Sequence, residues 1–296
     1  MNDKIGIIGF GTVGNVLANI FNRAGISFAV YDVLMEDPSR KEMIISNAKK
    51  SNAPVLDLPS LIEQSGYIIS TVTTQVAEKV AGNCLPHLKQ GKIFIDCNST
   101  SPGIKINLYK IIQTSGADFV EGVILNAVNM GDSSLTMLLG GKKGRQITDL
   151  LQKAEIKAKF YSEEIGKASM FKMLRSVFSK GVEVLLLEML VAAKRAGIES
   201  EMWKEIASFM DSKPFEEIGG TWMRSHATAC ERRYFEMQQV IETLKELGIP
   251  PILSQATSQY FEQSVSLKLN TFFTETPSDA GVVIASISDQ LLKKYN

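Results

Sequence analysis

Residues 5–32, IGIIGFGTVGNVLANIFNRAGISFAVYD, decide the fold of this chain. A short apolar run, Ile5 to Ile8, predicts a buried strand, and it breaks at the glycine-rich segment GFGTVG, residues 9–14. Apolar residues at helical spacing follow and stop near Gly25, and a second apolar run, Phe28 to Tyr31, ends on Asp32. This order of strand, glycine-rich turn, helix, strand and acid is that of a dinucleotide-binding βαβ unit.

Each glycine of the turn has its own physical role. Gly9 allows a tight turn, Gly11 lets the backbone approach a pyrophosphate, and Gly14 lets the helix pack against the strand. The backbone N–H groups at the helix start face the phosphates, and the helix dipole adds attraction. We therefore predict cofactor contacts along the whole segment: Gly9, Phe10, Gly11, Thr12, Val13 and Gly14.

Asp32 bears on the choice of cofactor. Its carboxylate is placed to accept hydrogen bonds from the two hydroxyls of the adenine ribose, and it repels a 2′-phosphate. No arginine follows it directly. The sequence therefore favours NAD over NADP. NADP stays open, because Arg40 or Lys41 could reach a phosphate.

Composition excludes several classes of protein. The 296 residues are 45% hydrophobic with a formal net charge of +0, so no basic surplus indicates nucleic acid or an anionic membrane. The three cysteines and two histidines are scattered, which predicts neither a disulfide framework nor a metal site. The longest apolar run, 182–193, contains Glu183 and Glu188 and reads as a buried helix. No signal peptide precedes Lys4, and we expect a cytoplasmic protein.

Alternating strands and helices continue to Ile165, and the remainder is helical. We predict an α/β Rossmann-type N-terminal domain, residues 1–165, and an all-α C-terminal domain, residues 166–296. A long interdomain helix at 166–195 joins them. Short strands include 53–55, and separate helices are expected at 214–229 and 231–247. The long helix has apolar residues around much of its circumference. We expect a second subunit to help cover them, and therefore a homodimer or higher homo-oligomer.

Two polar segments follow predicted strands at the edge where ligands bind in an open parallel sheet. Thr71, Val72 and Thr73 end one strand and are candidate cofactor contacts, although plain strand-end threonines are an alternative. The segment CNSTSP, residues 97–102, follows another strand. In it Asn98 is a candidate for cofactor and substrate, and Ser99 and Thr100 for substrate, the alternative being a turn that satisfies its own hydrogen bonds.

These motifs resemble the β-hydroxyacid dehydrogenase superfamily, which includes 3-hydroxyisobutyrate dehydrogenase and 6-phosphogluconate dehydrogenase. The resemblance covers most of the chain in four segments: 9–14 with the acid at 32, 96–102, 119–141, and GKASMFK at 166–172. The last is similar to the opening of the family's interdomain helix. There the family's lysine is the general acid/base, which implies that role for Lys172.

The chain departs from the family at the substrate loop. Residues 121–127 read EGVILNA where the family has Asp-Ala-Pro-Val-Ser-Gly-Gly, so the backbone cradle for a substrate carboxylate is missing. Asn98 replaces a serine and Ser176 replaces an asparagine. Ser179 stands where the decarboxylating members have an assisting glutamate, which disfavours decarboxylation. The resemblance therefore implies the cofactor and the lysine, not the substrate.

The lysine has candidate partners on its own helix. Lys172 faces the cleft if Met173 and Leu174 face the core. Arg175 lies on the same helix face and could favour loss of the lysine proton or clamp an anionic group, the alternative being a structural ion pair. Ser176 could hydrogen-bond the substrate or Lys172. In the C-terminal domain, His226 and Arg233 are further candidates for a small anionic substrate, with structural roles equally open.

The sequence thus predicts an NAD(P)-dependent dehydrogenase that acts on a small 3-hydroxy acid or sugar acid, phosphorylated or not, or reduces the matching carbonyl. Two alternatives stand beside it. An imine reductase on the same scaffold is disfavoured by the lysine, and a dinucleotide-sensing protein without turnover is supported by the altered substrate loop alone.

Overall fold

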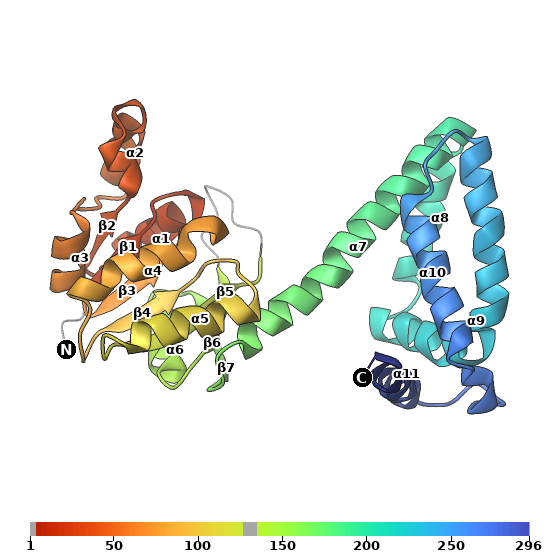
Figure 1. Ribbon diagram of the computed structural model, residues 1–296. Coiled ribbons are helices and arrows are strands. Elements are labelled where there is room, and N and C mark those ends of the chain that lie inside the picture. The colour runs from red at the N-terminus through yellow and green to blue at the C-terminus, as the bar shows by residue number, and fades with distance from the viewer. Residues whose placement is uncertain (1–3, 127–134, 296) are drawn as a thin grey trace. The chain divides into compact units, whose positions relative to one another are not determined.

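The computed structural model describes residues 4–126 and 135–295, without the side chain of Tyr295, and divides the chain into two compact units (Figure 1). The N-terminal unit is Met1–Val177 and the helical unit is Phe178–Asn296. The division lies within one helix, α7 (Lys167–Ala196), which corresponds to the predicted interdomain helix. The predicted domain boundary at residue 165 precedes the start of this helix and stays a prediction.

A seven-stranded sheet of order β2-β1-β3-β4-β5-β6-β7 forms the centre of the N-terminal unit. Only the pair β5–β6 is antiparallel among the described strands. Because β1 lies between β2 and β3, the strand order reverses there, at the carboxyl ends where ligands bind in such sheets. The strands are β1 (Ile5–Ile8), β2 (Phe28–Tyr31), β3 (Tyr67–Ser70), β4 (Ile93–Asp96), β5 (Asp118–Ile124), β6 (Thr136–Gly140) and β7 (Lys157–Ser162).

Helices cover both faces of this sheet, because its strands carry apolar side chains on both. One apolar cluster packs against helices α1 (Thr12–Arg23), α2 (Pro38–Lys50) and α6 (Gly144–Lys153). The other packs against α3 (Leu58–Gln64), α4 (Ala77–Cys84) and α5 (Pro102–Gln113). Along β4, Ile93 and Ile95 enter the first cluster and Phe94 the second. The predicted Rossmann-type domain is confirmed.

The predicted strand at 53–55 was wrong. Only Val55 pairs with β2, as an isolated bridge to Val30. Val30 donates to the carbonyl of Pro54 and accepts from Leu56. Pro54 has no N–H to donate, so pairing stops after one bridge.

The described part of the helical unit contains no strands. It consists of the rest of α7 with α8 (Glu199–Asp211), α9 (Phe215–Glu246), α10 (Ile252–Ser266) and α11 (Ala280–Tyr295). The two helices predicted between residues 214 and 247 are the single helix α9, because residues 229–231 contain no Gly or Pro to end it. Within the described residues, no helix is long and apolar enough to cross a membrane.

Candidate functional site

The glycine-rich turn joins β1 to α1 with little room to spare. Gly9 has φ +91°, and a Cβ there would lie 2.7 Å from the carbonyl oxygen of Thr71. A Cβ on Gly14 would lie 2.1 Å from the carbonyl oxygen of Gly9. Gly11 differs, since among the described residues no atom lies within 4 Å of its Cβ position. The turn is therefore closed toward β3 and open at Gly11.

The open side of the turn fits a dinucleotide pyrophosphate. Gly11 is the N-cap of α1, and the described residues supply neither a side-chain cap nor an acid in the first turn. The N–H groups at the helix start therefore remain available for an anion, with the helix dipole adding attraction. Gly9, Gly11 and Gly14 thus have the geometry that their sequence roles predict.

Two polar side chains hold the turn in place. Asn15 donates from Nδ2 to the carbonyl oxygens of Phe10 (2.7 Å) and Gly11 (2.9 Å). Asp32 accepts from the N–H of Phe10 (2.6 Å) and of Leu34 (2.8 Å). Sequence reasoning missed Asn15, whose only signal is its place in the first turn of α1. Each oxygen of Asp32 can accept a further bond, so its ribose contact stays a prediction.

A cavity of about 380 Å³ lies beside this turn, within the N-terminal unit. It brings together predicted residues from four parts of the sequence: the helix start, the end of β3, the end of β4 and α7. Its lining is Val13, Thr71, Val72, Thr73, Thr74, Gln75, Cys97, Asn98, Ser99, Ile124, Asn126 and Lys172. Thr74, Gln75, Cys97, Ile124 and Asn126 were not predicted.

A buried polar network lies under one wall of the cavity. Lys105 and Asp96 form an ion pair at 2.5 Å with both side chains buried. The ammonium of Lys105 also donates to the carbonyl oxygens of Asp96 (2.8 Å) and Asn98 (2.9 Å). Desolvation raises the pKa of Asp96, and the charge of Lys105 opposes that rise. A buried ion pair is stable only when hydrogen bonds also satisfy its remaining donors and acceptors. The sequence analysis did not predict this pair.

The network fixes the orientation of Asn98. Its Nδ2 donates to Asp96 Oδ1 (2.5 Å) and to Ser70 Oγ (3.1 Å). Its Oδ1 is buried and has no partner among the described residues. Asn98 therefore has an acceptor left over for a ligand. The alternative of a fully satisfied turn does not hold for this side chain.

Lys172 lines the same cavity as these groups. The ammonium is near the buried thiol of Cys97, whose pKa is raised to about 12 chiefly by desolvation. The lysine is half-buried, Met173 is half-buried, and Leu174 is 63% exposed rather than in the core. Lys172 therefore reaches the cavity without the core contact that the sequence argument assumed for Leu174.

A buried carboxylate holds the start of the helix that carries Lys172. Glu121 on β5 is fully buried and accepts from the N–H groups of Gly166 (2.9 Å) and Ala168 (3.1 Å). A Cβ on Gly140 would lie 2.5 Å from its Oε1. Glu121 and Gly140 both lie in the segment that resembles the family, but sequence reasoning gave neither a role.

The other predicted substrate residues of this unit have different surroundings. Arg175 donates from Nη1 to the carbonyl oxygen of Leu125, beyond β5, which is neither the clamp nor the structural ion pair considered from sequence. The hydroxyl of Ser176 donates to the backbone carbonyl oxygen of Lys172 (3.0 Å) on the preceding turn of the helix. Thr100 is buried and absent from the cavity lining. Ala127, the last residue of the segment 121–127, lies outside the described residues, as do residues 128–134.

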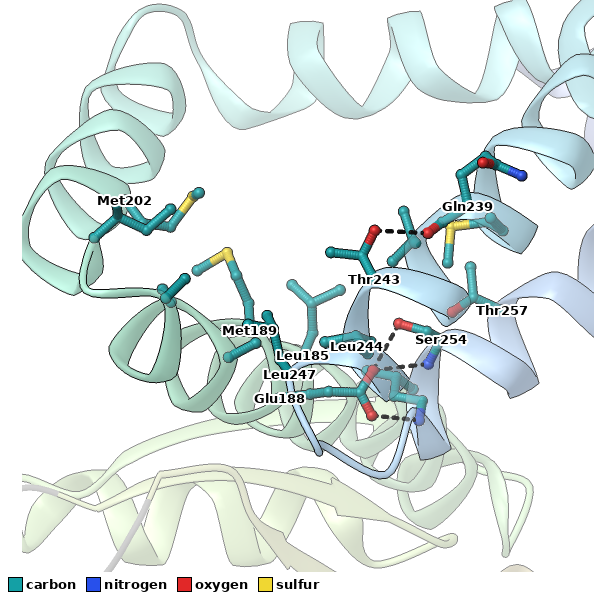
Figure 2. Close-up of a pocket in the computed structure, with 17 residues that line it drawn as sticks. Leu185, Glu188, Met189, Met202, Gln239, Thr243, Leu244, Leu247, Ser254 and Thr257 are labelled. Carbon is teal, nitrogen blue, oxygen red and sulfur yellow. Dashed lines mark hydrogen bonds between the residues drawn. The ribbon is translucent and has the colours of Figure 1, made fainter.

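The helical unit contains the two remaining predicted residues. His226 and Arg233 line one cavity there, together with aromatic side chains. A larger hollow of about 590 Å³ lies between α7, α8, α9 and α10 (Figure 2). Its charged side chain, Glu188, accepts from the N–H groups of Leu253 (2.8 Å) and Ser254 (2.9 Å) and caps α10. Apolar groups otherwise dominate its wall, so it offers little chemistry.

Comparisons with known proteins agree with this geometry. Residues 4–154 match the family described as the NAD binding domain of 6-phosphogluconate dehydrogenase. Residues 193–264 match a domain of unknown function, DUF1932. An uncharacterized 28.5 kDa protein of Methanothermus fervidus is 26% identical over 88% of this chain and 98% of its own length.

Two further likenesses concern proteins with named activities. The mitochondrial 3-hydroxyisobutyrate dehydrogenase of Bos taurus is 26% identical, over 46% of this chain and only 40% of that enzyme. An imine reductase variant from Myxococcus stipitatus, solved with NAD⁺, has a TM-score of 0.76 at 16% identity, over 97% of this chain and 100% of that one. At that identity the second likeness concerns the fold alone.

Proposed function

Because the chain belongs to the family of the NAD binding domain of 6-phosphogluconate dehydrogenase, we propose that it is an NAD(P)-dependent dehydrogenase of small 3-hydroxy acids or sugar acids. It would oxidise the alcohol or reduce the matching carbonyl. The observation that carries the proposal is the cavity that holds Lys172 with Asn98 and the start of α1. A bound nicotinamide would supply the hydride chemistry. The protein has to bind and orient the substrate and to transfer a proton to or from its oxygen.

Lys172 is proposed as the general acid/base. Oxidation of an alcohol requires removal of its hydroxyl proton, and reduction returns a proton to the same oxygen. Glu121 fixes the start of the helix that carries Lys172. The lysine is therefore held in a constant position relative to the substrate oxygen. The half-buried position of Lys172 restricts its contact with water.

NAD is proposed as the preferred cofactor. Asp32 directly follows β2, the residue is 8% exposed, and its negative charge repels a 2′-phosphate. Arg40 is 3.9 Å from Asp37 in a partly exposed pair and could still turn to a phosphate. Asp32→Ala should reduce the ratio of kcat/KM for NAD to that for NADP, and an unchanged ratio would contradict this assignment.

The proposed substrate contacts differ in their structural support. Asn98 has a free acceptor and, like Ser99, lines the cavity, so these two carry the proposal. Arg175 and Ser176 are engaged with backbone carbonyls and would have to change partners. Thr100, His226 and Arg233 are proposed from sequence, outside this cavity. A small anionic substrate would match the positive charges of Lys172 and Arg175 on α7.

We also propose that the chain works as a homodimer or higher homo-oligomer. Exposed apolar side chains on α7 include Leu174 (63%), Val177 (72%) and Leu187 (57%). Large exposed apolar faces mark surfaces that another chain covers. The apolar hollow of Figure 2 adds further uncovered surface in the helical unit.

The test is a nicotinamide absorbance assay with NAD and NADP against a panel of 3-hydroxy, sugar and phosphosugar acids. Lys172→Ala should reduce turnover by about two to four orders of magnitude, the usual scale for an acid/base group. Lys167→Ala is the matched control, because this lysine lies on the same helix in an exposed pair with Glu164. Equal turnover in both variants would remove Lys172 from the mechanism.

A second candidate function is a dinucleotide sensor without turnover. It is favoured by the segment 121–126, which lacks the family's Ser-Gly-Gly cradle. NADH binding with no turnover across the panel would support it over the dehydrogenase. Imine reduction is the other enzymatic alternative, and activity on cyclic imines that survives Lys172→Ala would favour it.

A further inference from the structure

A cavity of about 530 Å³ lies within the helical unit between α9, α10 and α11. Its volume is typical of small-molecule pockets. Most of its wall is aromatic or aliphatic, and its two basic side chains are His226 and Arg233. The other lining residues are Trp222, Met223, Tyr260, Phe261, Val283, Ile284 and Ile287.

Arg233 brings a positive charge to this apolar wall. Its Nη2 donates to Ser225 Oγ (2.7 Å) and its Nη1 to the carbonyl oxygen of Trp222 (3.4 Å). These bonds orient the guanidinium but do not neutralise it. In the part of the chain that the structure describes, Arg233 forms no ion pair, whereas its neighbour Arg232 pairs with Glu236 in solvent. A half-buried cation against apolar groups lacks a counter-charge.

His226 adds a neutral polar group to the same wall. Its ring stacks on Phe261 with centroids 5.5 Å apart. Its Nε2 is buried and has no hydrogen-bond partner among the described residues. Burial, and then the charge of Arg233, lower the pKa of His226, so the imidazole is neutral near pH 7. A buried polar atom without a partner is costly unless a ligand supplies one.

We propose that this cavity binds a carboxylic acid with an aromatic or branched apolar body. The carboxylate is held by Arg233 and by Nε2–H of His226, and the body lies between Trp222, Phe261 and the side chains of α11. One carboxylate matches one uncompensated cation and one neutral donor. A second negative charge would face apolar groups, and a cation would be repelled by Arg233.

This site goes beyond the proposed dehydrogenase function, because it gives His226 and Arg233 a ligand other than the dehydrogenase substrate for which the sequence suggested them. It is built wholly from the helical unit, and none of its residues lines the cavity of Lys172. Ligand binding to this cavity can therefore be measured without turnover. A lack of dehydrogenase activity would not contradict the carboxylate site, and a lack of carboxylate binding would not contradict the dehydrogenase.

The experiment uses the full chain and its own tryptophans. The chain has two, and Trp203→Phe leaves Trp222 in the cavity wall as the reporter. Titration with 4-phenylbutyrate should change its fluorescence in a saturable way. The uncharged 4-phenylbutyramide, of nearly the same shape, should bind about 10- to 100-fold more weakly, since hydrogen bonds to charged groups are the stronger ones.

Adjacent arginines supply the matched control. In the Trp203→Phe background, Arg233→Gln should weaken the binding of 4-phenylbutyrate by about 10- to 100-fold, and Arg232→Gln should leave the affinity unchanged. Arg233→Lys keeps the charge and should keep the preference for the acid over the amide. Equal NADH binding in all variants checks the N-terminal unit, and an unaltered far-UV spectrum checks the helical unit.

Three results would overturn the proposal. They are the absence of saturable binding, equal affinity for acid and amide, and equal loss in the two glutamine variants. Absence of binding together with Trp222 emission that depends on protein concentration would indicate that a second copy covers this face instead.

Discussion

In the N-terminal unit the ion pair Lys105–Asp96 is buried, whereas in the helical unit the pairs Lys194–Glu199 and Arg232–Glu236 are exposed to solvent. The apolar side chains differ between the two units in the same direction. Among the described residues, the N-terminal unit has two large buried apolar clusters and one small one, while the helical unit has one cluster of three buried residues, Ala192, Leu244 and Ile249. The N-terminal unit buries both faces of its sheet in these clusters, and the helical unit leaves much of its apolar surface exposed to a ligand or another chain.

The largest expected effect concerns the buried pair. Lys105→Met leaves the carboxylate of Asp96 buried without its partner, and we expect a loss of about 3–5 kcal/mol in the free energy of unfolding. Urea unfolding followed by circular dichroism measures it. Lys194→Met breaks an exposed ion pair in the helical unit, and the stability of this variant should equal that of the unmodified protein within error. Equal losses in both variants would remove the difference between the units.

Glycine substitutions test how tightly atoms are packed inside each unit. Gly14→Ala places a Cβ against the carbonyl oxygen of Gly9, so we expect about 1–3 kcal/mol of destabilisation and clearly weaker NADH binding. Within the described parts of the chain, a Cβ on Gly219 in α9 would contact the ring of Phe215 alone, at 3.8 Å. Gly219→Ala should therefore be neutral or stabilise by up to about 1 kcal/mol. Thermal unfolding and NADH fluorescence distinguish the two results.

The exposed apolar face of α7 predicts self-association. Leu187→Lys should lower the molar mass measured by light scattering at micromolar concentration toward that of one chain. Ile106→Lys, at a 37% exposed position on α5 of the N-terminal unit, is the control and should leave the mass unchanged. A monomeric unmodified protein would contradict the expectation directly.

The smallest expected effect is a pH dependence at His226. Because its pKa is lowered in the folded state, the unfolded chain binds a proton at a higher pH than the folded chain does. The contribution of His226 to stability is therefore unchanged above about pH 6.5 and becomes unfavourable as the pH falls below it. Both tryptophans lie in the helical unit, so urea unfolding followed by their fluorescence reports on it. His226→Gln should flatten the decline between about pH 7 and 5, and an identical decline would contradict this account.

Much of the N-terminal unit could be predicted because its signals are local. The run from Ile5 to Asp32 specifies strand, turn and helix through residues close in sequence, and the structure has them there. The family resemblance drawn from these motifs is confirmed by the match over residues 4–154. The same locality explains the error at 53–55, where Val55 is compatible with a strand but Pro54 cannot continue the pairing.

The sequence by itself determined the βαβ unit, the family and the position of Lys172 on a long helix, because each depends on periodicity or on motif spacing. Only the tertiary structure decided which buried charges meet. Lys105 reaches Asp96 across a turn, and Glu121 on β5 meets the N–H groups that begin α7. The tertiary structure also set Arg233 against a wall of aromatic and aliphatic side chains from three helices. Glu121 lies 45 residues before Gly166 in the sequence, and Lys105 lies nine residues after Asp96. The energies of both contacts depend on burial, which no local pattern of residues specifies.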